Sequence, residues 1–241
     1  LTHVTEWQNF FFDDVNSFTY VSMTNMKKDF YGIELGLDFK LTSFLNFKAL
    51  GTWNEAKNMN NADVVYMNST KSTSYKDVVY NKGMRENGTP LSVYSGILSF
   101  HQGGWFIDLA GNYYDRIYLS YAPNFYYGNT LRTMGTKLGG MDAEGNFTPA
   151  PQMEGKGGFM LDASIGKSIY LKRGSLSINL MITNLLNNQQ IVTGGYQQGR
   201  SNYTINANTG ETNMRAYNFS KNPKKYYVNG INGMLNIAYK F

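Results

Sequence analysis

The last thirteen residues, Asn229–Phe241 ("NGINGMLNIAYKF"), carry the pattern that decides the fold. From Ile231 to Phe241 the odd positions hold apolar side chains or glycine, and the even positions are mostly polar. Such an alternation with a period of two predicts a β-strand whose two faces have different neighbours. What lies against the apolar face therefore decides the function.

The same alternation recurs upstream. It predicts a β-strand in each of six further segments: Phe30–Lys40, Leu45–Asn54, Leu91–His101, Trp105–Tyr114, Phe159–Ile169 and Ser175–Asn184. Lys167 is an exception, because it falls among the apolar positions of its segment. An eighth, less regular strand is expected within Ser17–Asp29. We therefore expect an all-β, antiparallel protein with about eight strands.

The gaps between these segments alternate between very short and very long. Three tight turns are predicted at Leu41–Phe44, Gln102–Gly104 and Leu171–Gly174. Three long polar loops, expected to lack secondary structure, run roughly over Glu55–Gly88, Leu119–Glu154 and Asn188–Lys225. Soluble domains rarely carry such loops. Outer-membrane barrels combine short turns on one side with long loops on the other, so the spacing favours a transmembrane β-barrel.

Aromatic residues also favour a barrel over a soluble β-sandwich, which shows the same alternation. Rings gather beside the short turns and the C-terminus, and Trp53 and Tyr113 lie at the opposite ends of their strands. A membrane interface selects aromatic girdles at both ends of an apolar band, whereas a sandwich places its rings in the core. The aromatics near the turns are Phe39, Phe44, Phe100, Trp105, Tyr170, Tyr239 and Phe241.

The overall composition narrows the classes of function. The 241 residues include no cysteine, which excludes disulfides and thiolate chemistry. The net charge is +5 without a run of like charges, so nucleic acid is not expected as a partner. No apolar stretch of about 18 residues is present, which leaves a barrel as the way for this chain to cross a membrane. The chain starts at Leu1 without a leader, so we expect a mature protein or a fragment.

Several stretches resemble the C-terminal barrel strands of TonB-dependent outer-membrane receptors, in particular those of Bacteroidetes. The more specific pieces are "YGIELG" (Tyr31–Gly36) and "NLLNNQ" (Asn184–Gln189), and the likeness covers nearly the whole chain. Receptors of this family have a 22-stranded barrel that is occluded by a plug. The resemblance implies that residues 1–241 form about the last third of such a barrel, without the plug or the TonB-binding segment.

The resemblance further implies location in the outer membrane of a Gram-negative cell, with membrane lipid and the TonB system as partners. The implied function is active import of an unidentified nutrient: a glycan, a peptide or a metal chelate. A surface lipoprotein lid is a further partner in glycan-importing relatives. The alternative from the residues alone is a self-contained eight-stranded barrel with a structural or adhesive role, and a soluble β-sandwich binding protein is the third possibility.

Candidate site residues are few. Tyr121, Phe125, Tyr126 and Tyr127 in the second long loop are candidates for stacking on a flat ligand, and packing of the loop itself is the competing interpretation. Tyr239 and Phe241 are candidates for an assembly signal, because a final aromatic strand is read by the assembly machinery in the barrels that this chain resembles. No nucleophile–base pair stands out, so we expect no catalysis, and no metal or other cofactor is expected.

Overall fold

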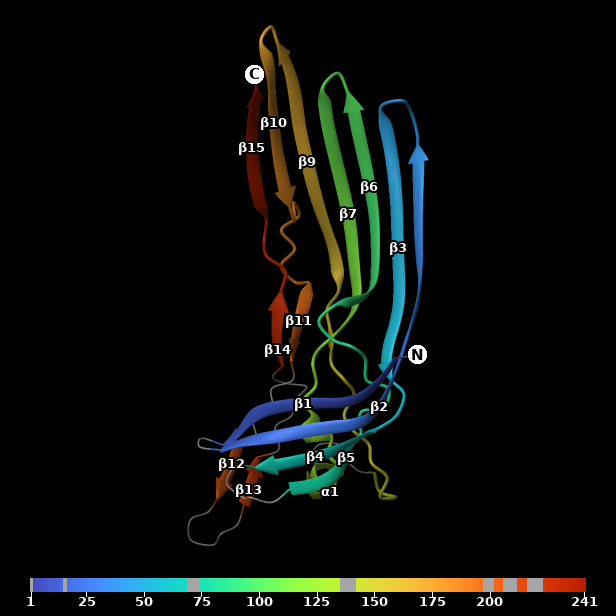
Figure 1. Ribbon diagram of the computed structural model, residues 1–241, viewed down its shortest axis with the longest axis vertical. Coiled ribbons are helices and arrows are strands. Elements are labelled where there is room, and N and C mark those ends of the chain that lie inside the picture. The colour runs from blue at the N-terminus through green and yellow to red at the C-terminus, as the bar shows by residue number, and fades with distance from the viewer. Residues whose placement is uncertain are drawn as a thin grey trace.

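The computed structural model describes residues 2–14, 17–68, 74–134, 142–196, 202–205, 212–215 and 223–241. Its fold is all-β, and one antiparallel sheet dominates it (Figure 1). Neighbouring strands in the body of this sheet follow the order β15-β10-β9-β7-β6-β3-β2. Their bounds are β2 Ser17–Lys40, β3 Leu45–Asn58, β6 Pro90–Gln102, β7 Trp105–Tyr118, β9 Gly158–Leu171, β10 Gly174–Thr183 and β15 Asn232–Lys240.

These seven long strands correspond to the seven regular segments that the alternation predicts; six of them differ only by a few residues at the ends, and β2 begins well before its predicted segment. The tight turns are also where the sequence predicts them, between β2 and β3, β6 and β7, and β9 and β10. Gly103 and Gly104 make the second turn with φ angles of 58° and 80°, which only glycine adopts without strain. Figure 1 shows the three turns and the C-terminus at one end of the sheet, and the longer connections at the other.

The eighth predicted strand is not a separate element. Residues Ser17–Asp29 continue without a break into the next segment, and together they form the 24-residue strand β2. Asn25 interrupts the alternation with a left-handed φ of 55°. As a result, the buried residues Val21 and Met23 are followed by buried Met26 rather than by residue 25. The buried face therefore changes from odd-numbered to even-numbered positions at Asn25, which explains why the pattern of Ser17–Asp29 looks irregular.

The long loops contain secondary structure, contrary to the expectation from the sequence. The first carries the hairpin of β4 (Ala62–Asn68) and β5 (Ser74–Val79), which extends the sheet beside β2. The second carries a 3₁₀-helix, η1 (Pro123–Tyr126), the helix α1 (Gly128–Met134), and the short strand β8 (Glu154–Gly155). The third carries two strand pairs: β11 (Val192–Tyr196) with β14 (Lys224–Tyr227), and β12 (Asn202–Ile205) with β13 (Thr212–Arg215).

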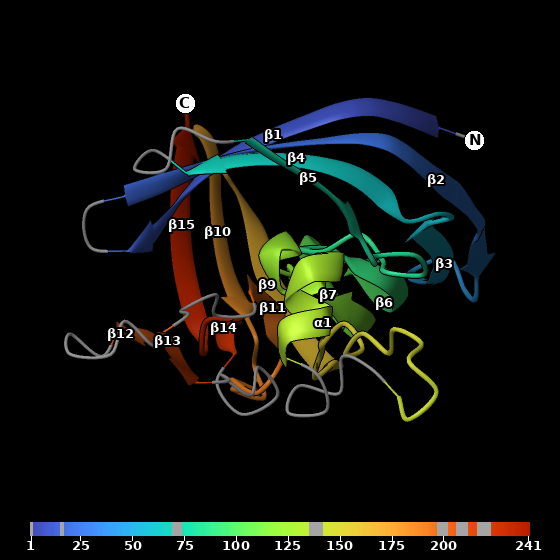
Figure 2. The same ribbon diagram turned by 90° about the horizontal axis from the view of Figure 1, so that it is seen from below.

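The buried core lies at the loop end rather than on the long sheet. Side chains from β2, β4, β5 and η1 meet there, and the most deeply buried include Val21, Val64 and Tyr126. A second small cluster joins Ala56, Leu91 and Tyr118. Figure 2 shows this end from below, where β1 (Thr2–Asp14), β2 and β4 cross over the long strands. The loops of this protein therefore form a folded body with its own core.

The sheet is open within the described residues. β15 forms one edge, and the Asp29–Lys40 part of β2 pairs only with β3. Every pair is antiparallel, so the first and the seventh of these strands run in the same direction, toward the tight turns (Figure 1). β1 pairs with the lower part of β2, from Ser17 to Lys28. Neither η1 nor α1, the described helices, is long and apolar enough to span a membrane.

Candidate functional site

The register of the sheet joins the apolar positions of all seven long strands into one continuous surface, called here the apolar face. For example, Leu235 is paired with Leu180, which is paired in turn with Ile165. The larger side chains of this face are Tyr31, Ile33, Leu35, Leu37, Phe39, Phe47, Trp53, Tyr94, Leu98, Phe100, Trp105, Ile107, Leu109, Tyr113, Phe159, Leu161, Ile165, Ile169, Leu176, Ile178, Leu180, Ile182, Leu235, Ile237 and Tyr239.

No element of the described residues packs over the apolar face. Ile33 is 72% exposed and Ile237 is 62% exposed, and many of their neighbours are exposed to a third or more. Soluble monomers rarely expose a contiguous apolar patch larger than a few hundred Å². A face of seven strands is far larger, and nothing among the described residues supplies the apolar environment that would shield it from water.

Aromatic rings lie in pairs near both ends of the apolar face. At the loop end, the ring centroids of Tyr31 and Trp53 are 6.1 Å apart. At the turn end, Phe44 and Phe100 pack edge to face at 5.7 Å. Tyr170 departs from the expected girdle, since its register partner is Ser175 on the opposite face.

Lys167, the charged exception in the sequence, has a structural explanation. Its aliphatic stem starts on the apolar face, and its ammonium lies 4.7 Å from the centre of the Trp105 ring. The same ammonium donates a hydrogen bond of 2.9 Å to the carbonyl of Gly103 in the neighbouring turn. The long side chain thus places its charge at the end of the face, as lysine and arginine side chains do at membrane interfaces.

The opposite surface of the long strands, called here the polar face, carries a network of side-chain hydrogen bonds. The Ser99 hydroxyl donates to Asp108 at 2.5 Å, and the Ser95 hydroxyl donates to Asn112 at 2.6 Å. Asn112 in turn donates to Asp162 on β9. These bonds link β6, β7 and β9 across a surface of serine, asparagine and aspartate, which suits contact with water or with a polar protein segment.

A charged cluster, called here the rim cluster, lies where the apolar face meets the loops. Glu55 on β3 is only 5% exposed and receives hydrogen bonds from Arg116 on β7 and, at 2.6 Å, from Arg85 in the first loop. Arg116 has a left-handed φ of 56°, and its guanidinium lies over the Trp53 ring, 4.9 Å from its centre. A buried carboxylate paired with two cations fixes the first loop against the sheet.

Sequence reasoning missed the rim cluster. Its members are 30 and 61 residues apart along the chain, so no local motif brings them together. The available signal was Glu55 itself, an acid that follows Trp53 at the next position of the apolar alternation.

The four loop aromatics are brought together, but inside the loop core. Phe125, Tyr126 and Tyr127 are buried, and Tyr126 is only 1% exposed. Tyr127 stacks on Tyr66 of β4 with centroids 4.8 Å apart. These contacts correspond to the packing interpretation, and ligand binding by these residues remains a prediction that the contacts do not test.

Tyr121 is partly buried and packs against the loop core. Its hydroxyl accepts a hydrogen bond of 2.9 Å from the side chain of Asn81, which is itself buried. Burial is the main cause that raises the pKa of the Tyr121 hydroxyl above its usual range. The Asn81 side chain also accepts a hydrogen bond from the backbone of Ala62, so this contact ties the second loop to the β4–β5 hairpin.

The assembly-signal candidates lie at the turn end of β15. Tyr239 lies on the apolar face, and its hydroxyl donates a hydrogen bond of 2.5 Å to the carbonyl of Arg173 in the last tight turn. Phe241 is 99% exposed, and its ring lies 5.9 Å from that of Tyr239. β15 pairs with β10 along one edge and, within the described residues, presents its other edge unpaired.

The "NLLNNQ" stretch forms a compact knot of hydrogen bonds at the loop end. The Asn184 amide donates to the carbonyls of Asn188 and Asn229, and its oxygen accepts from the backbone of Asn188. Asn187 accepts from the backbone of Ile231. The knot therefore joins the end of β10 to the chain that enters β15, which fixes the base of the third loop.

Among the described residues there is no group of three or more histidines, cysteines or acids that could hold a metal ion. Comparisons with protein-family models, with curated proteins and with solved structures find nothing that matches this chain.

Proposed function

We propose that this chain forms part of the wall of an outer-membrane β-barrel, with its apolar face in contact with lipid. The observation that carries the proposal is the continuous, exposed apolar face of seven strands, opposite a hydrogen-bonded polar face. Alternation of lipid-facing and lumen-facing residues is the signature of transmembrane barrels.

The dimensions of the strands support this proposal. β10 has ten residues, which span about 33 Å at ~3.3 Å per residue. A tilt of about 40° reduces this height to about 25 Å, the usual height of the apolar band in such barrels. The aromatic pairs and the Lys167–Trp105 contact lie near the ends of this band, where interfacial side chains are favoured.

The tight turns and Phe241 would face the periplasm, and the folded loops would face the outside of the cell. This orientation follows from the usual asymmetry of barrels, in which the longer loops are extracellular. It places the loop core, including Tyr121 and the three buried rings, where an incoming molecule first meets the protein.

The role within a barrel is proposed from the resemblance to TonB-dependent receptors. We propose active import of a nutrient, a glycan, a peptide or a metal chelate, with energy from the TonB system and with a surface lipoprotein as a further partner. The polar face supports this role, because a wall of serine, asparagine and aspartate suits contact with a plug.

A self-contained eight-stranded barrel is less well supported. The predicted eighth strand is the lower part of β2, and β2 and β15 run in the same direction. Closure of this sheet on itself between these two strands would require a parallel pair, whereas barrels of this class are antiparallel throughout. Closure by antiparallel pairs needs an odd number of additional strands.

Single cysteines test the membrane location, since the chain has none of its own. Leu180→Cys is expected to resist a water-soluble maleimide in bilayers and to react after detergent is added, while the neighbouring Asn179→Cys reacts in both. On whole cells, an impermeant maleimide should label Glu144→Cys in the second loop but not Lys172→Cys in the last turn. Rapid labelling of Leu180→Cys in bilayers would exclude a lipid-facing sheet.

Transport is tested in cells that produce the protein from its complete gene. Accumulation of one compound from a panel of glycans, peptides and metal chelates should stop when an uncoupler collapses the proton-motive force. A matched strain without the gene supplies the background. Uptake that continues without the proton-motive force would refute the energised mechanism while leaving the barrel location intact.

A further inference from the structure

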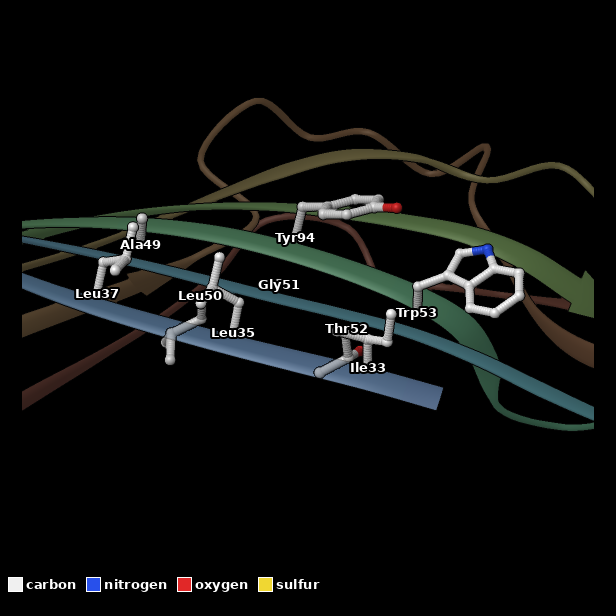
Figure 3. Close-up of a pocket in the computed structure, with 9 residues that line it drawn as sticks. All are labelled: Ile33, Leu35, Leu37, Ala49, Leu50, Gly51, Thr52, Trp53 and Tyr94. Atoms are coloured by element: carbon white, nitrogen blue, oxygen red, sulfur yellow. The ribbon is translucent and has the colours of Figure 1, made fainter. Parts of the chain in front are cut away.

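The apolar face is hollowed at one place, between β2, β3 and β6 (Figure 3). Gly51 forms the floor, and Ile33, Leu35, Trp53 and Tyr94 stand around it. The hollow, called here the Gly51 groove, encloses about 420 Å³ and its exposed lining is almost entirely apolar. A Cβ at Gly51 would lie 3.4 Å from the Tyr94 ring, so a side chain would fit there and fill the groove.

The rim cluster adjoins the groove at its loop end through Trp53. Trp53 belongs to both, because one part of it lines the groove and Arg116 covers its ring. Arg116 donates hydrogen bonds to Glu55, the carbonyl of Asn54 and the Ser92 hydroxyl. Arg85 bonds Glu55 through Nε alone and lies 5.0 Å from the centre of the Tyr118 ring.

The three side chains of the rim cluster carry a formal charge of +1 beside the groove, because two guanidinium groups share the Glu55 carboxylate. Of the two, Arg85 has the more exposed side chain, at 33% against 17% for Arg116. An arginine guanidinium can bind a phosphate in a forked geometry, which makes Arg85 the better candidate of the two for an anionic group.

We propose that the Gly51 groove and the rim cluster together bind one anionic lipid that carries a phosphate group. An acyl chain lies over Gly51 between Leu35 and Tyr94, and the phosphate meets Arg85 at the headgroup level. The inference rests on the proposed membrane location, because it requires lipid at the apolar face. It adds a specific lipid site to a surface that otherwise only faces the bilayer.

A photo-crosslinking residue tests this site in the complete protein. A diazirine side chain at Leu35 lies in the groove, and one at Leu180 lies on the apolar face far along the sheet. The protein is reconstituted in phosphatidylcholine with a one-fifth share of phosphatidylglycerol, and lipid adducts are identified by mass spectrometry. At Leu35 we expect the ratio of phosphatidylglycerol to phosphatidylcholine adducts to be about fivefold higher than the ratio of the two lipids in the membrane, the factor that one cation near an anionic surface contributes. At Leu180 the adducts should follow the lipid composition.

Matched variants separate the two halves of the site. Arg85→Gln should remove the enrichment at Leu35 while lipid adducts persist, because Glu55 keeps Arg116 as a partner. Gly51→Leu should reduce all lipid adducts at Leu35, whereas Gly96→Leu on the same face, outside the groove, should not. Gly51→Ala serves as a milder filling variant if the leucine variant does not fold.

The outcomes distinguish the site from the membrane location. Adducts that follow the lipid composition at both positions would overturn the lipid site and leave the lipid-facing sheet in place. Absence of lipid adducts at both positions would overturn both proposals. Protein adducts at Leu35, with lipid adducts at Leu180, would show that a protein partner or a second copy covers the groove, which also overturns the lipid site.

Discussion

Arginine at two adjacent positions of β10 tests the facing of the sheet. Leu180 lies on the apolar face near the middle of the band, between Ile165 and Leu235 of the neighbouring strands. Asn179 lies on the polar face and accepts a hydrogen bond of 3.0 Å from Ser164. The two substitutions introduce the same charge one residue apart, into the apolar face in one case and the polar face in the other.

The expected costs follow from these environments. Leu180→Arg should lower the free energy of unfolding by about 2–4 kcal/mol, the cost of arginine on a lipid face near the midplane. Asn179→Arg loses one hydrogen bond and keeps its charge in a polar space, so it should cost about 1 kcal/mol. The difference corresponds to at least a fivefold shift in the ratio of folded to unfolded protein.

Urea titration of the complete protein in lipid vesicles measures both costs, with heat-modifiable migration on gels as the readout of the folded barrel. Leu180→Ala supplies the control for lost apolar contact, which is worth about 2 kcal/mol at most. Equal penalties for Leu180→Arg and Asn179→Arg would refute the assignment of the two faces. A larger penalty at Asn179 would reverse it.

Three further predictions concern the C-terminus, the asparagine knot and the loop core. Phe241→Ser in the complete protein should lower the amount of folded barrel in the outer membrane much more than the urea midpoint of what folds, because the exposed ring makes few contacts; a proportional fall in both would reduce Phe241 to an interface anchor. Asn184→Ala should lower the unfolding free energy by about 3–5 kcal/mol, because it removes three hydrogen bonds and places alanine at a φ of 52°. Asn184→Gly should recover only the part of this cost that is due to backbone strain. Equal stability of the wild type and both variants by urea titration would contradict a stabilising role of these hydrogen bonds. The pKa of Tyr121 is raised above its ordinary value of 10.0, so its neutral hydroxyl stabilises the folded loops below pH 10 and this stability is lost as the pH rises further. Tyr121→Phe should therefore lose less stability than the wild type between pH 9 and pH 11. Parallel losses in the two proteins would contradict the burial of this hydroxyl.

The long strands could be predicted from sequence because alternation over ten or more residues is a local signal. Pairing registers place Leu176, Leu180 and their counterparts on the face that the alternation assigns to them. Lys167 looked like an error in the pattern, but a long side chain can start on one surface and end at another. The sequence thus predicted which face of the sheet each residue lies on, but not where the ammonium group of a long side chain such as Lys167 ends.

Other features could not be read from the sequence because they depend on distant partners or on a single backbone angle. One left-handed residue, Asn25, reverses the parity of β2, so a strictly alternating template fails there. The hairpin strands in the loops have four to seven residues, too few for a periodic signal. Hydrophobicity alone does not separate a ring on a ligand-binding surface from one in a core, so the position of Tyr126 had to come from the fold.

The parity reversal at Asn25 bears on how this chain tolerates change during evolution. Above Asn25 the odd positions of β2 face outward, whereas below it Val21 and Met23 turn into the loop core. Insertion of one residue between Asn25 and Tyr31 would turn five apolar side chains toward the polar face and Glu34 and Asp38 toward the apolar one. Insertion of one residue in the bend at Met59–Asn61 alters no strand face. Gains and losses of single residues should therefore accumulate in the loops and be absent from the strand above Asn25, which confines length variation to the loop end of the protein.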